Sequence, residues 1–262
     1  MFQTTDLKIH PDWEESFRAA GLLDLKSVSK RKFDWFEAPN KRRGGWSGVT
    51  RIVLNPEEPQ EKQKAVFLKI QQNHFYIAPN TFFTKRLTFE RENAAMMELQ
   101  PHCPAVPEVL HFANWIEGGN RFAILITEAL DDWLQLHDWQ MNRTTLPKPD
   151  KATLHKALEA IAATSRQINE AGWVHMCFSA KHLFIKPNAD GTMRVKTIDL
   201  EKTRKRIGPW RRTIKDCSHL LRYTPNLDDE DKLHYLRCYF QTTEFSSLQL
   251  KLIRRMRGAP KI

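Results

Sequence analysis

The chain has 262 residues, of which 41% are hydrophobic and 10% aromatic, and its formal net charge at pH 7 is +10. Enough apolar residues are present for the core of one large domain or of two lobes, which excludes a disordered chain. The positive charge favours an anionic partner: a nucleic acid, a phosphorylated substrate or a membrane surface.

The cysteines and the apolar runs exclude further classes of protein. The four cysteines have no CxxC spacing, so they indicate neither a zinc site nor a disulfide framework, and reduced cytoplasmic thiols explain them most simply. Residues 1–10 lack the apolar run of a secretory signal. No stretch approaches the roughly 20 apolar residues that span a bilayer, so we expect any membrane contact to be peripheral.

Residues 1–130 are predicted to form a small antiparallel-sheet lobe with one main helix and an N-terminal helical extension. The extension is a helix at 11–23, in which Trp13, Phe17 and Ala20 recur at helical spacing. The main helix is expected at 87–99, after an irregular segment at 71–85. We predict strands at 49–54, 65–70, 106–112 and 122–127, the last two joined by a turn at Gly118-Gly119-Asn120.

Residues 131–262 are predicted to form a mostly helical lobe. A helix at 151–171 ends at Gly172, and two short strands then flank the turn Pro187-Asn188-Ala189-Asp190-Gly191. The remaining helices are expected at 215–223, 229–241 and 246–257. Strands followed by helices, with one helix among the strands, indicate an α+β fold of two lobes.

A glycine-rich segment comes immediately before the first strand. It contains Gly44, Gly45, Ser47 and Gly48, and three glycines in five residues let backbone amides approach a phosphate closely. A structural hairpin turn is the alternative interpretation.

Lys69 lies in the apolar strand Ala-Val-Phe-Leu-Lys-Ile, where a lysine either protects a sheet edge or neutralises the phosphates of ATP. The second role requires a carboxylate to hold the lysine. In the predicted helix, Glu92 shares a face with Met96 and Leu99, which places it on the buried side, where a charge needs a partner. Glu90 is the alternative partner. The interpretation without a functional role is a glutamate on the solvent-exposed face of the helix.

A second cluster surrounds the predicted hairpin and comprises His175, Cys177, Lys181, His182 and Asp199. This layout is typical of the catalytic loop and metal-binding aspartate of protein kinases, in which the aspartate binds the metal that bridges the phosphates. A helix cap is the structural alternative for Asp199. Asp216 either braces the loop near His175 by accepting hydrogen bonds or is a helix-start carboxylate. Neither histidine has further zinc ligands beside it in sequence, so we predict no zinc site here.

Basic residues are concentrated in two segments. The first follows Asp199 directly, where a kinase receives its acceptor, and it suits a phosphorylated or acidic acceptor, although a charge run is more often a solvated face. It comprises Lys202, Arg204, Lys205, Arg206, Arg211, Arg212 and Lys215. The second is interpreted as a basic tail and comprises Arg254, Arg255, Arg257 and Lys261.

In this order, the motifs resemble the bacterial lipopolysaccharide kinase family, which includes the heptose and Kdo kinases and, most similar here, the InaA-type proteins. The resemblance spans roughly residues 42–223 and rests on Gly-Gly-Trp-Ser-Gly, Leu-Lys-Ile, Phe-Glu-Arg-Glu-Asn, His-Met-Cys-Phe-Ser-Ala-Lys-His-Leu-Phe and Ile-Asp-Leu-Glu-Lys. It implies a bilobal protein-kinase-like fold. It also implies an ATP-dependent enzyme that uses Mg²⁺ and transfers the γ-phosphate to a sugar hydroxyl of the lipopolysaccharide inner core.

The resemblance assigns roles on the nucleotide side. Lys69 would be the phosphate lysine and Glu92 its partner. The glycine-rich segment and Glu128, near the crossover between the lobes, would also belong to the nucleotide-binding residues.

The resemblance likewise assigns roles in the second lobe. His175 would be the loop histidine, Lys181 would belong to the catalytic residues, and Asp199 would be the metal ligand. His182 takes the place of the asparagine of protein kinases, as a histidine does in the heptose kinases, and it would serve the metal and the nucleotide.

The family's pattern is broken at Cys177, which occupies the position of the catalytic aspartate of the heptose kinases. A general base contributes about 10²–10⁴ in rate, whereas phosphoryl transfer depends mainly on positioning and charge neutralisation. A thiol with a pKa near about 8.5 is mostly protonated at neutral pH, although basic surroundings would lower that pKa. The two hypotheses are an ATP-dependent sugar kinase and a pseudokinase that binds nucleotide and regulates a partner.

The partner implied by the resemblance is an acidic sugar or a lipopolysaccharide core acceptor. The expected location is the cytoplasm, with peripheral contact at the inner face of the inner membrane. A nucleic-acid-binding protein, suggested by the charge and by eight tryptophans, ranks last because the sequence contains no recognisable nucleic-acid-binding module.

Overall fold

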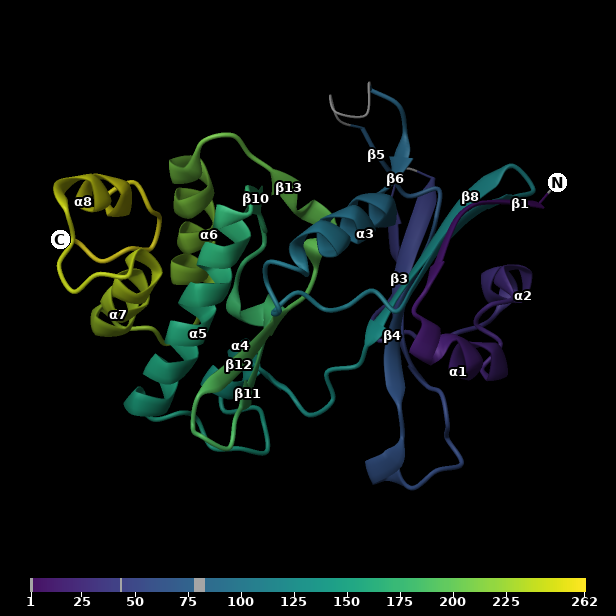
Figure 1. Ribbon diagram of the computed structural model, residues 1–262, viewed down its shortest axis with the longest axis horizontal. Helices are drawn as coiled ribbons and strands as arrows, with labels where there is room; N and C mark the ends of the chain where they lie inside the picture. Colours follow the sequence, from purple (N-terminus) through teal and green to yellow (C-terminus); the bar gives the residue numbers. More distant parts are fainter. Residues whose placement is uncertain (1, 43, 78–82) are drawn as a thin grey trace. The chain divides into compact units, whose positions relative to one another are not determined.

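The structure is a computed structural model that describes residues 2–42, 44–77 and 83–262 (Figure 1). The chain divides into two compact units. The first consists of Met1–Met97 with Glu108–Ala129, and the second consists of Glu98–Pro107 with Leu130–Ile262. The domain boundary at residue 130 stays a prediction.

The first unit is built on a six-stranded antiparallel sheet in the order β1-β7-β8-β4-β3-β2. Its strands are β1 (Phe2–Ile9), β2 (Asn40–Arg42), β3 (Gly45–Val53), β4 (Ala65–Gln72), β7 (His111–Glu117) and β8 (Asn120–Glu128). A separate ribbon pairs β5 (Phe75–Tyr76) with β6 (Arg86–Leu87). A short 3₁₀ turn, η2 (Gln60–Lys62), lies between β3 and β4 in the chain.

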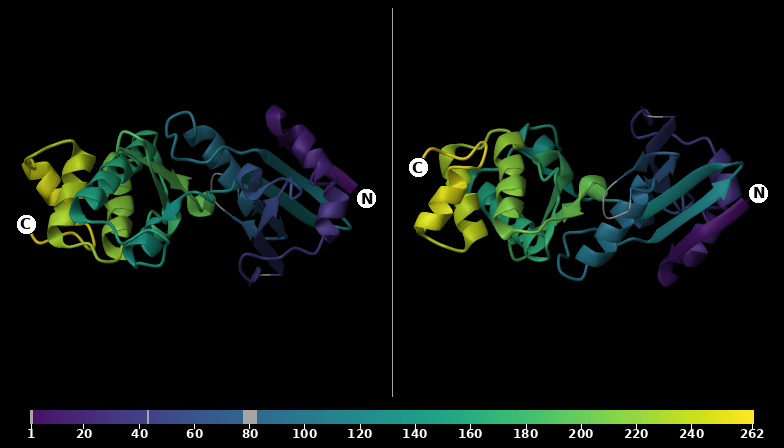
Figure 2. Two further views of the ribbon diagram at one scale, coloured as in Figure 1. Left: turned by 90° about the horizontal axis from the view of Figure 1, so that it is seen from below. Right: turned by 90° about the horizontal axis from the view of Figure 1, so that it is seen from above.

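One face of this sheet packs against the N-terminal helices α1 (Glu14–Ala19) and α2 (Leu25–Lys30), which follow the 3₁₀ turn η1 (Pro11–Trp13) (Figure 2). Successive strand residues point to opposite faces, so Val66, Leu68 and Ile70 of β4 share one face. They join Phe17 and Leu25 in one buried core. The opposite face of β4 is therefore left for α3 (Thr88–Leu99), the main helix of this unit.

The second unit is mostly helical and contains α4 (Leu136–Gln140), α5 (Lys151–Glu170), α6 (Pro209–Tyr223), α7 (Asp229–Phe240) and α8 (Ser247–Ile253). Helix α5 begins where the side chain of Asp150 accepts a hydrogen bond from the Thr153 backbone N–H. It ends before Gly172, which has a φ of +89° and adopts it without steric cost. This capping confirms the predicted helix.

Short strands in the second unit hold the predicted loop. β11 (Leu183–Pro187) pairs with β12 (Met193–Thr197) and with β9 (Leu134–Gln135), and β10 (Trp173–Val174) pairs with β13 (Arg204–Lys205). The 3₁₀ turns η4 (Ala180–His182) and η5 (Leu200–Lys202) lie directly before β11 and after β12 in the chain. The predicted hairpin is thus present as β11 and β12.

Several predicted positions are wrong. The helix expected at 11–23 is shorter, because α1 ends at Ala19 before Gly21 with a φ of +69°, and a strand, β1, precedes it. The strand expected at 106–112 begins only at His111 as β7; Val106 and Leu110 are buried but precede the strand. Helix α6 begins at Pro209 rather than at 215, because proline suits the first turn of a helix.

Two further predictions differ from the structure in where strands or helices lie along the chain. The segment expected to be irregular, 71–85, contains the end of β4 and β5, and its residues 78–82 lie outside the described residues. Helix α8 ends at Ile253 rather than at 257.

In the described parts of the chain, no helix combines the length and the apolar character needed to cross a membrane.

Candidate active site

Lys69 and Glu92 form a close ion pair in the first unit. Lys69 Nζ lies 2.6 Å from Glu92 Oε1, and the Glu92 side chain is only 2% exposed. Lys69 is paired on both sides, to β3 at Val49 and to β8 at Leu125. The edge-strand interpretation of Lys69 is therefore wrong, because β4 is an interior strand.

Glu90, the alternative partner, belongs to a different network. Its Oε1 accepts hydrogen bonds from Arg121 at 3.0 Å and from Asn114 at 3.3 Å. Burial raises the pKa of Glu90, and the Arg121 charge opposes that rise. The helix face shared by Glu92, Met96 and Leu99 thus correctly distinguished the two glutamates.

The glycine-rich segment lies largely within a strand rather than before one. Gly44, with a φ of +77°, precedes β3, whereas Gly45, Ser47 and Gly48 are part of it. A Cβ at Gly45 would lie 2.3 Å from the carbonyl oxygen of Asn73, and one at Gly48 would lie 2.5 Å from the ring of Trp35. Two of the glycines therefore have a packing reason, and a phosphate-binding role for this segment stays a prediction.

His175 organises the loop of the second unit. Its ring is fully buried; Nδ1 accepts a hydrogen bond from the Cys177 backbone N–H at 3.3 Å, which leaves Nε2 to donate to Thr197 Oγ1 at 2.8 Å. Burial lowers the pKa of His175 to about 3, and the nearby His182 adds to the shift. His175 is therefore neutral at physiological pH and positions the backbone rather than transferring protons.

Asp216 braces the same loop from α6. Its Oδ2 accepts hydrogen bonds from the His175 backbone N–H and from Asn169 Nδ2, both at 2.9 Å, and its Oδ1 accepts one from the Met176 backbone N–H at 3.1 Å. Asp216 is fully buried in the middle of α6, so the helix-start interpretation is wrong. Burial raises its pKa to about 6.

Cys177 lies at the centre of this loop with its thiol half-buried. Burial raises the pKa of the Cys177 thiol, and the charge of Asp199 adds to the rise, whereas Lys202 opposes it. The expectation that basic surroundings would lower this pKa is wrong, because burial outweighs them. At neutral pH the thiol is therefore protonated and cannot accept a proton as a general base.

His182 and Asp199 face each other. His182 Nδ1 lies 2.7 Å from the Cys177 carbonyl oxygen; because a carbonyl only accepts, Nδ1 carries the proton and Nε2 keeps its lone pair. That Nε2 lies 3.5 Å from Asp199 Oδ2. Asp199 has a φ of +61° and occupies the N-cap position of η5, but its side chain makes no capping hydrogen bond. The helix-cap interpretation of Asp199 is therefore wrong.

This pair fits a divalent cation. Ligand atoms about 2.1 Å from an octahedral ion are about 3 Å apart, close to the separation between His182 and Asp199. A carboxylate oxygen is the ligand that Mg²⁺ prefers, while an imidazole nitrogen suits transition metals better. Asp199 is therefore the stronger candidate ligand for Mg²⁺, and His182 is a neighbouring one.

The remaining predicted site residues are exposed. Lys181 lies in η4, where its backbone carbonyl accepts a hydrogen bond from Gln135 Nε2 at 3.0 Å. Glu128 is the last residue of β8, in register with Val66 of β4. Their roles stay predictions.

The two basic segments meet on the second unit. One pocket is lined by Lys205, Arg206, Arg211 and Lys215 with apolar neighbours, and a second is lined by Arg211, Lys215, Arg222, Arg255 and Arg257 among others. The Arg257 backbone N–H donates to Ser218 Oγ of α6 at 3.1 Å. Arg255 and Arg257 therefore share a basic surface with the first segment, and the Arg257 backbone is held on α6, so the interpretation as a tail is wrong for these two arginines.

Sequence reasoning missed three residues that support the loop. Asn169 holds Asp216, Thr197 holds the His175 ring, and Thr203 Oγ1 donates to the His175 carbonyl oxygen at 3.3 Å. The motif itself offered one signal, since Thr197 is the last residue of β12 and stands two residues before Asp199 in the chain. Asn169 and Thr203 left no signal in the local pattern.

An antiparallel sheet with a lysine–glutamate pair, followed by a helical part with a braced histidine loop, defines an α+β protein of the protein-kinase-like class. The chain belongs to the lipopolysaccharide kinase (Kdo/WaaP) family, whose sequence profile matches residues 26–239. Protein InaA of Escherichia coli (strain K12) is 28% identical over 199 residues, which is 76% of this chain and 87% of InaA.

A solved structure shows the same fold. WaaP in complex with acyl carrier protein has a TM-score of 0.65 at 17% sequence identity and covers 95% of this chain and 92% of that chain. The BubR1 kinase domain has a TM-score of 0.41 at 11% identity and covers 73% of this chain and 60% of that chain. The predicted family and fold class are both confirmed.

Proposed function

We propose that this protein is an ATP-dependent phosphotransferase that transfers the γ-phosphate to a sugar hydroxyl of the lipopolysaccharide inner core. The observation that carries the proposal is the Lys69–Glu92 ion pair at 2.6 Å. A carboxylate that is almost fully buried holds the lysine amine in place, which is the arrangement that neutralises nucleotide phosphates in kinases. Membership of the lipopolysaccharide kinase family supports the reaction class.

Asp199, with His182 beside it, would hold Mg²⁺. The bound ion would neutralise charge on the phosphate oxygens. The chain's own contribution is to hold the Asp199 carboxylate beside His182, whose tautomer is fixed by the Cys177 carbonyl and leaves Nε2 facing Asp199.

Catalysis in this proposal proceeds without a strong general base. The Cys177 thiol is protonated at neutral pH because burial raises its pKa. Phosphoryl transfer has little covalent chemistry for the protein to perform, so positioning and charge neutralisation by Lys69 and Asp199 sustain a slow reaction. The acceptor hydroxyl would lose its proton to water late in the transfer.

The acceptor we propose is an anionic core sugar. The basic surface of the second unit, with Arg211 and Lys215 shared by two pockets, suits phosphate or carboxylate groups on such an acceptor. We place the protein in the cytoplasm, where ATP is available, in peripheral contact with the inner face of the inner membrane, where such an acceptor is made.

One observation favours a second candidate function, a pseudokinase that binds nucleotide and regulates a partner. It is Cys177 itself, because a protonated thiol stands where the family's catalytic aspartate is expected. Both functions share the nucleotide-binding residues, so nucleotide binding alone does not separate them.

Calorimetry with Mg-ATP tests the common part of the proposal. We expect binding to the full chain and at least about tenfold weaker binding to Lys69→Met and Asp199→Asn, since each removes one charge that contacts phosphates or metal. Binding that is unchanged in both variants would contradict the assignment. Transfer of phosphate to core oligosaccharide then distinguishes the kinase from the pseudokinase.

A further inference from the structure

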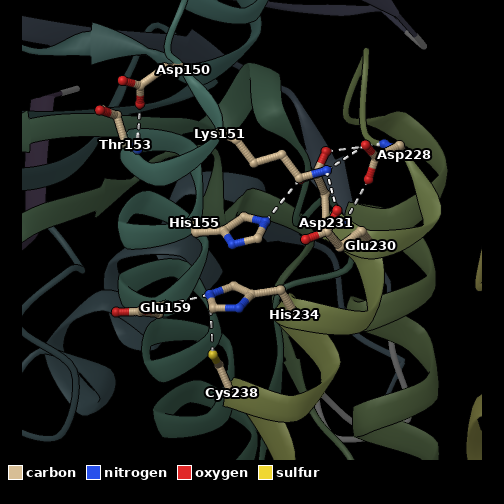
Figure 3. Close-up of polar contacts among 10 residues, drawn as sticks. All are labelled: Asp150, Lys151, Thr153, His155, Glu159, Asp228, Glu230, Asp231, His234 and Cys238. Carbon is tan, nitrogen blue, oxygen red and sulfur yellow. Dashed lines mark hydrogen bonds and ion pairs between the residues drawn. The ribbon is translucent and has the colours of Figure 1, made fainter.

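Helices α5 and α7 bring three metal-ligating side chains to one point on the second unit (Figure 3). His234 Nε2 lies 3.2 Å from Glu159 Oε1 and 3.7 Å from Cys238 Sγ. The ligand atoms of the three residues all lie within 4.8 Å of one another. A carboxylate, an imidazole and a thiol therefore converge, with the imidazole nitrogen in the middle.

We propose that Glu159, His234 and Cys238 form a zinc site that clips α5 to α7. Zinc bonds of about 2.1 Å to nitrogen or oxygen and about 2.3 Å to sulfur place tetrahedral ligand atoms about 3.4–3.6 Å apart. The two separations from His234 Nε2 lie close to this range, so a small side-chain adjustment brings all three atoms to bonding distance. This site is separate from the proposed phosphotransferase function and does not depend on it.

The His234 ring is already held in the orientation that the site needs. It stacks on the His155 ring with centroids 4.0 Å apart and an interplanar angle of 9°. His155 Nε2 lies 3.0 Å from Asp231 Oδ1, and Asp231 is buried. Asp231 also closes the capping box of α7 with Asp228, so this network fixes the His155 ring on which the His234 ring stacks.

Lys151 strengthens the same support. Its Nζ lies 2.5 Å from Asp228 Oδ2, 2.9 Å from Glu230 Oε2 and 3.4 Å from Asp231 Oδ1 (Figure 3). The first turn of α7 is thereby tied to the first residue of α5. The two helices are fixed against each other before any metal binds, which reduces the cost of forming the site.

The chemistry of the donors selects the metal. Thiolate and imidazole ligands favour zinc over Mg²⁺, which prefers oxygen ligands. His234 and Cys238 are one helical turn apart on α7, so one helix supplies two ligands and Glu159 of α5 supplies the third. The Glu159 side chain is 54% exposed, so water can occupy the fourth position.

Zinc binding changes the protons carried by the three ligands as follows from their chemistry. The Cys238 thiol loses its proton to solvent as the Zn–S bond forms. His234 binds through Nε2. The proton on that nitrogen, which faces the Glu159 carboxylate before the metal binds, moves by way of solvent to Nδ1, so that Nε2 donates its lone pair to the metal. Glu159 binds as the carboxylate and releases nothing.

Cobalt spectroscopy on the metal-free full chain tests the site, because Co²⁺ takes the same ligands and a cobalt–thiolate bond absorbs in the near ultraviolet. We expect a thiolate band that saturates with one Co²⁺ at this site and that Zn²⁺ abolishes, whether or not a second Co²⁺ binds at Asp199 and His182. The band should disappear in Cys238→Ser and persist in Cys177→Ser, which removes the other half-buried thiol. A band lost in Cys177→Ser but kept in Cys238→Ser would overturn the proposal, as would the absence of a thiolate band.

Zinc affinity and thermal unfolding provide the second measurement. His234→Asn and Glu159→Gln should each weaken zinc binding at least about tenfold, whereas Glu170→Gln, an exposed carboxylate on the same helix, should not. Zinc should raise the midpoint of thermal unfolding of the wild type and of Glu170→Gln, because it binds only the folded chain. Equal affinities and equal midpoint shifts in all variants would show that the three residues form only a hydrogen-bonded cluster.

Discussion

At the scale of single residues, the pairing of Lys69 with Glu92 is the basis of the nucleotide-binding role that we propose for the first unit. Glu92 is 1% exposed, and a buried carboxylate is stable only with a charged partner. The pair therefore fixes the position of a lysine amine on an interior strand. The Lys69 side chain is 22% exposed, compared with 2% for the Glu92 side chain.

Replacing Lys69 by methionine should lower phosphate transfer about 10²–10³-fold, because one preorganised positive charge on the phosphates is lost. Steady-state kinetics with Mg-ATP and core oligosaccharide measure the effect. Lys62→Met, in the exposed turn η2, is the matched control and should leave the rate unchanged. A Lys69→Met rate within threefold of the wild type would contradict the assigned role.

Under the proposed function, Cys177 affects the rate of phosphate transfer and not the binding of the nucleotide. Because burial keeps its thiol protonated, Cys177→Ser should change the rate less than about threefold. Cys177→Asp supplies a carboxylate at the position of the family's aspartate and should raise the rate about 10²-fold or more. Parallel initial-rate measurements on the two variants check both expectations, and a large loss in Cys177→Ser would show that the sulfur itself participates.

At the scale of elements, the loop after β10 is held by Asp216 from α6. The folded-state pKa of Asp216, about 6, lies above the ordinary value of 3.8. Ionisation of this carboxyl therefore costs stability: its contribution is complete below about pH 4 and is lost as the pH rises through 6. The loss is at most about 3 kcal/mol, from a shift of about two pKa units.

Urea unfolding of the wild type and of Asp216→Asn tests this element. Asparagine does not ionise, so the stability of the wild type relative to the variant should fall between pH 4 and pH 7. Asp229→Asn, an exposed residue in the first turn of α7, should follow the wild type at every pH. A wild-type stability that rises relative to Asp216→Asn over this range would contradict the buried, raised pKa.

The elements that sequence could predict are those with a strong local pattern. The helical spacing of Glu92, Met96 and Leu99 oriented α3 correctly, and the alternation around Lys69 oriented β4. β7 was misplaced because the buried apolar run before it lacks alternation, so no period marks where pairing starts. β1 was missed because its polar residues at a sheet edge resemble a loop.

In the candidate site, too, the sequence predicts what local patterns carry and does not predict what depends on tertiary packing. The motifs indicated His175 and Asp199, whereas the sequence left two interpretations open for Asp216. The contacts that decide between them join residues 41 and 40 positions apart in the chain. The pKa of Cys177 depended on burial, which the surrounding basic residues in the sequence do not report. His234 and Cys238 share a helical face, but their approach to α5 follows only from tertiary packing.

At the scale of the whole molecule, the net charge of +10 is concentrated in part on the basic surface of the second unit. Arg255 and Arg257 contribute to it, and the Arg257 backbone is held on α6. Such a surface raises the local concentration of anionic ligands and makes their binding sensitive to salt. This surface is where we expect the anionic part of the acceptor.

The double variant Arg255→Ala/Arg257→Ala should raise the KM for an anionic acceptor about 5–10-fold and flatten its dependence on ionic strength, with little change in the KM for ATP. Lys251→Ala/Lys261→Ala removes the same charge from exposed positions that do not line the pockets and is the matched control. Kinetics at two salt concentrations measure both effects. Identical behaviour of the two double variants would show that only net charge matters.

The central claim, that this chain is a working kinase with a weakened acceptor side, is tested by one assay. It measures the transfer of labelled γ-phosphate from ATP to dephosphorylated inner-core oligosaccharide by the wild type, Lys69→Met, Asp199→Asn and Cys177→Asp. We expect slow transfer by the wild type, loss in the first two variants and faster transfer by Cys177→Asp. No transfer by the wild type, with activity appearing only in Cys177→Asp, would contradict the claim and identify a pseudokinase.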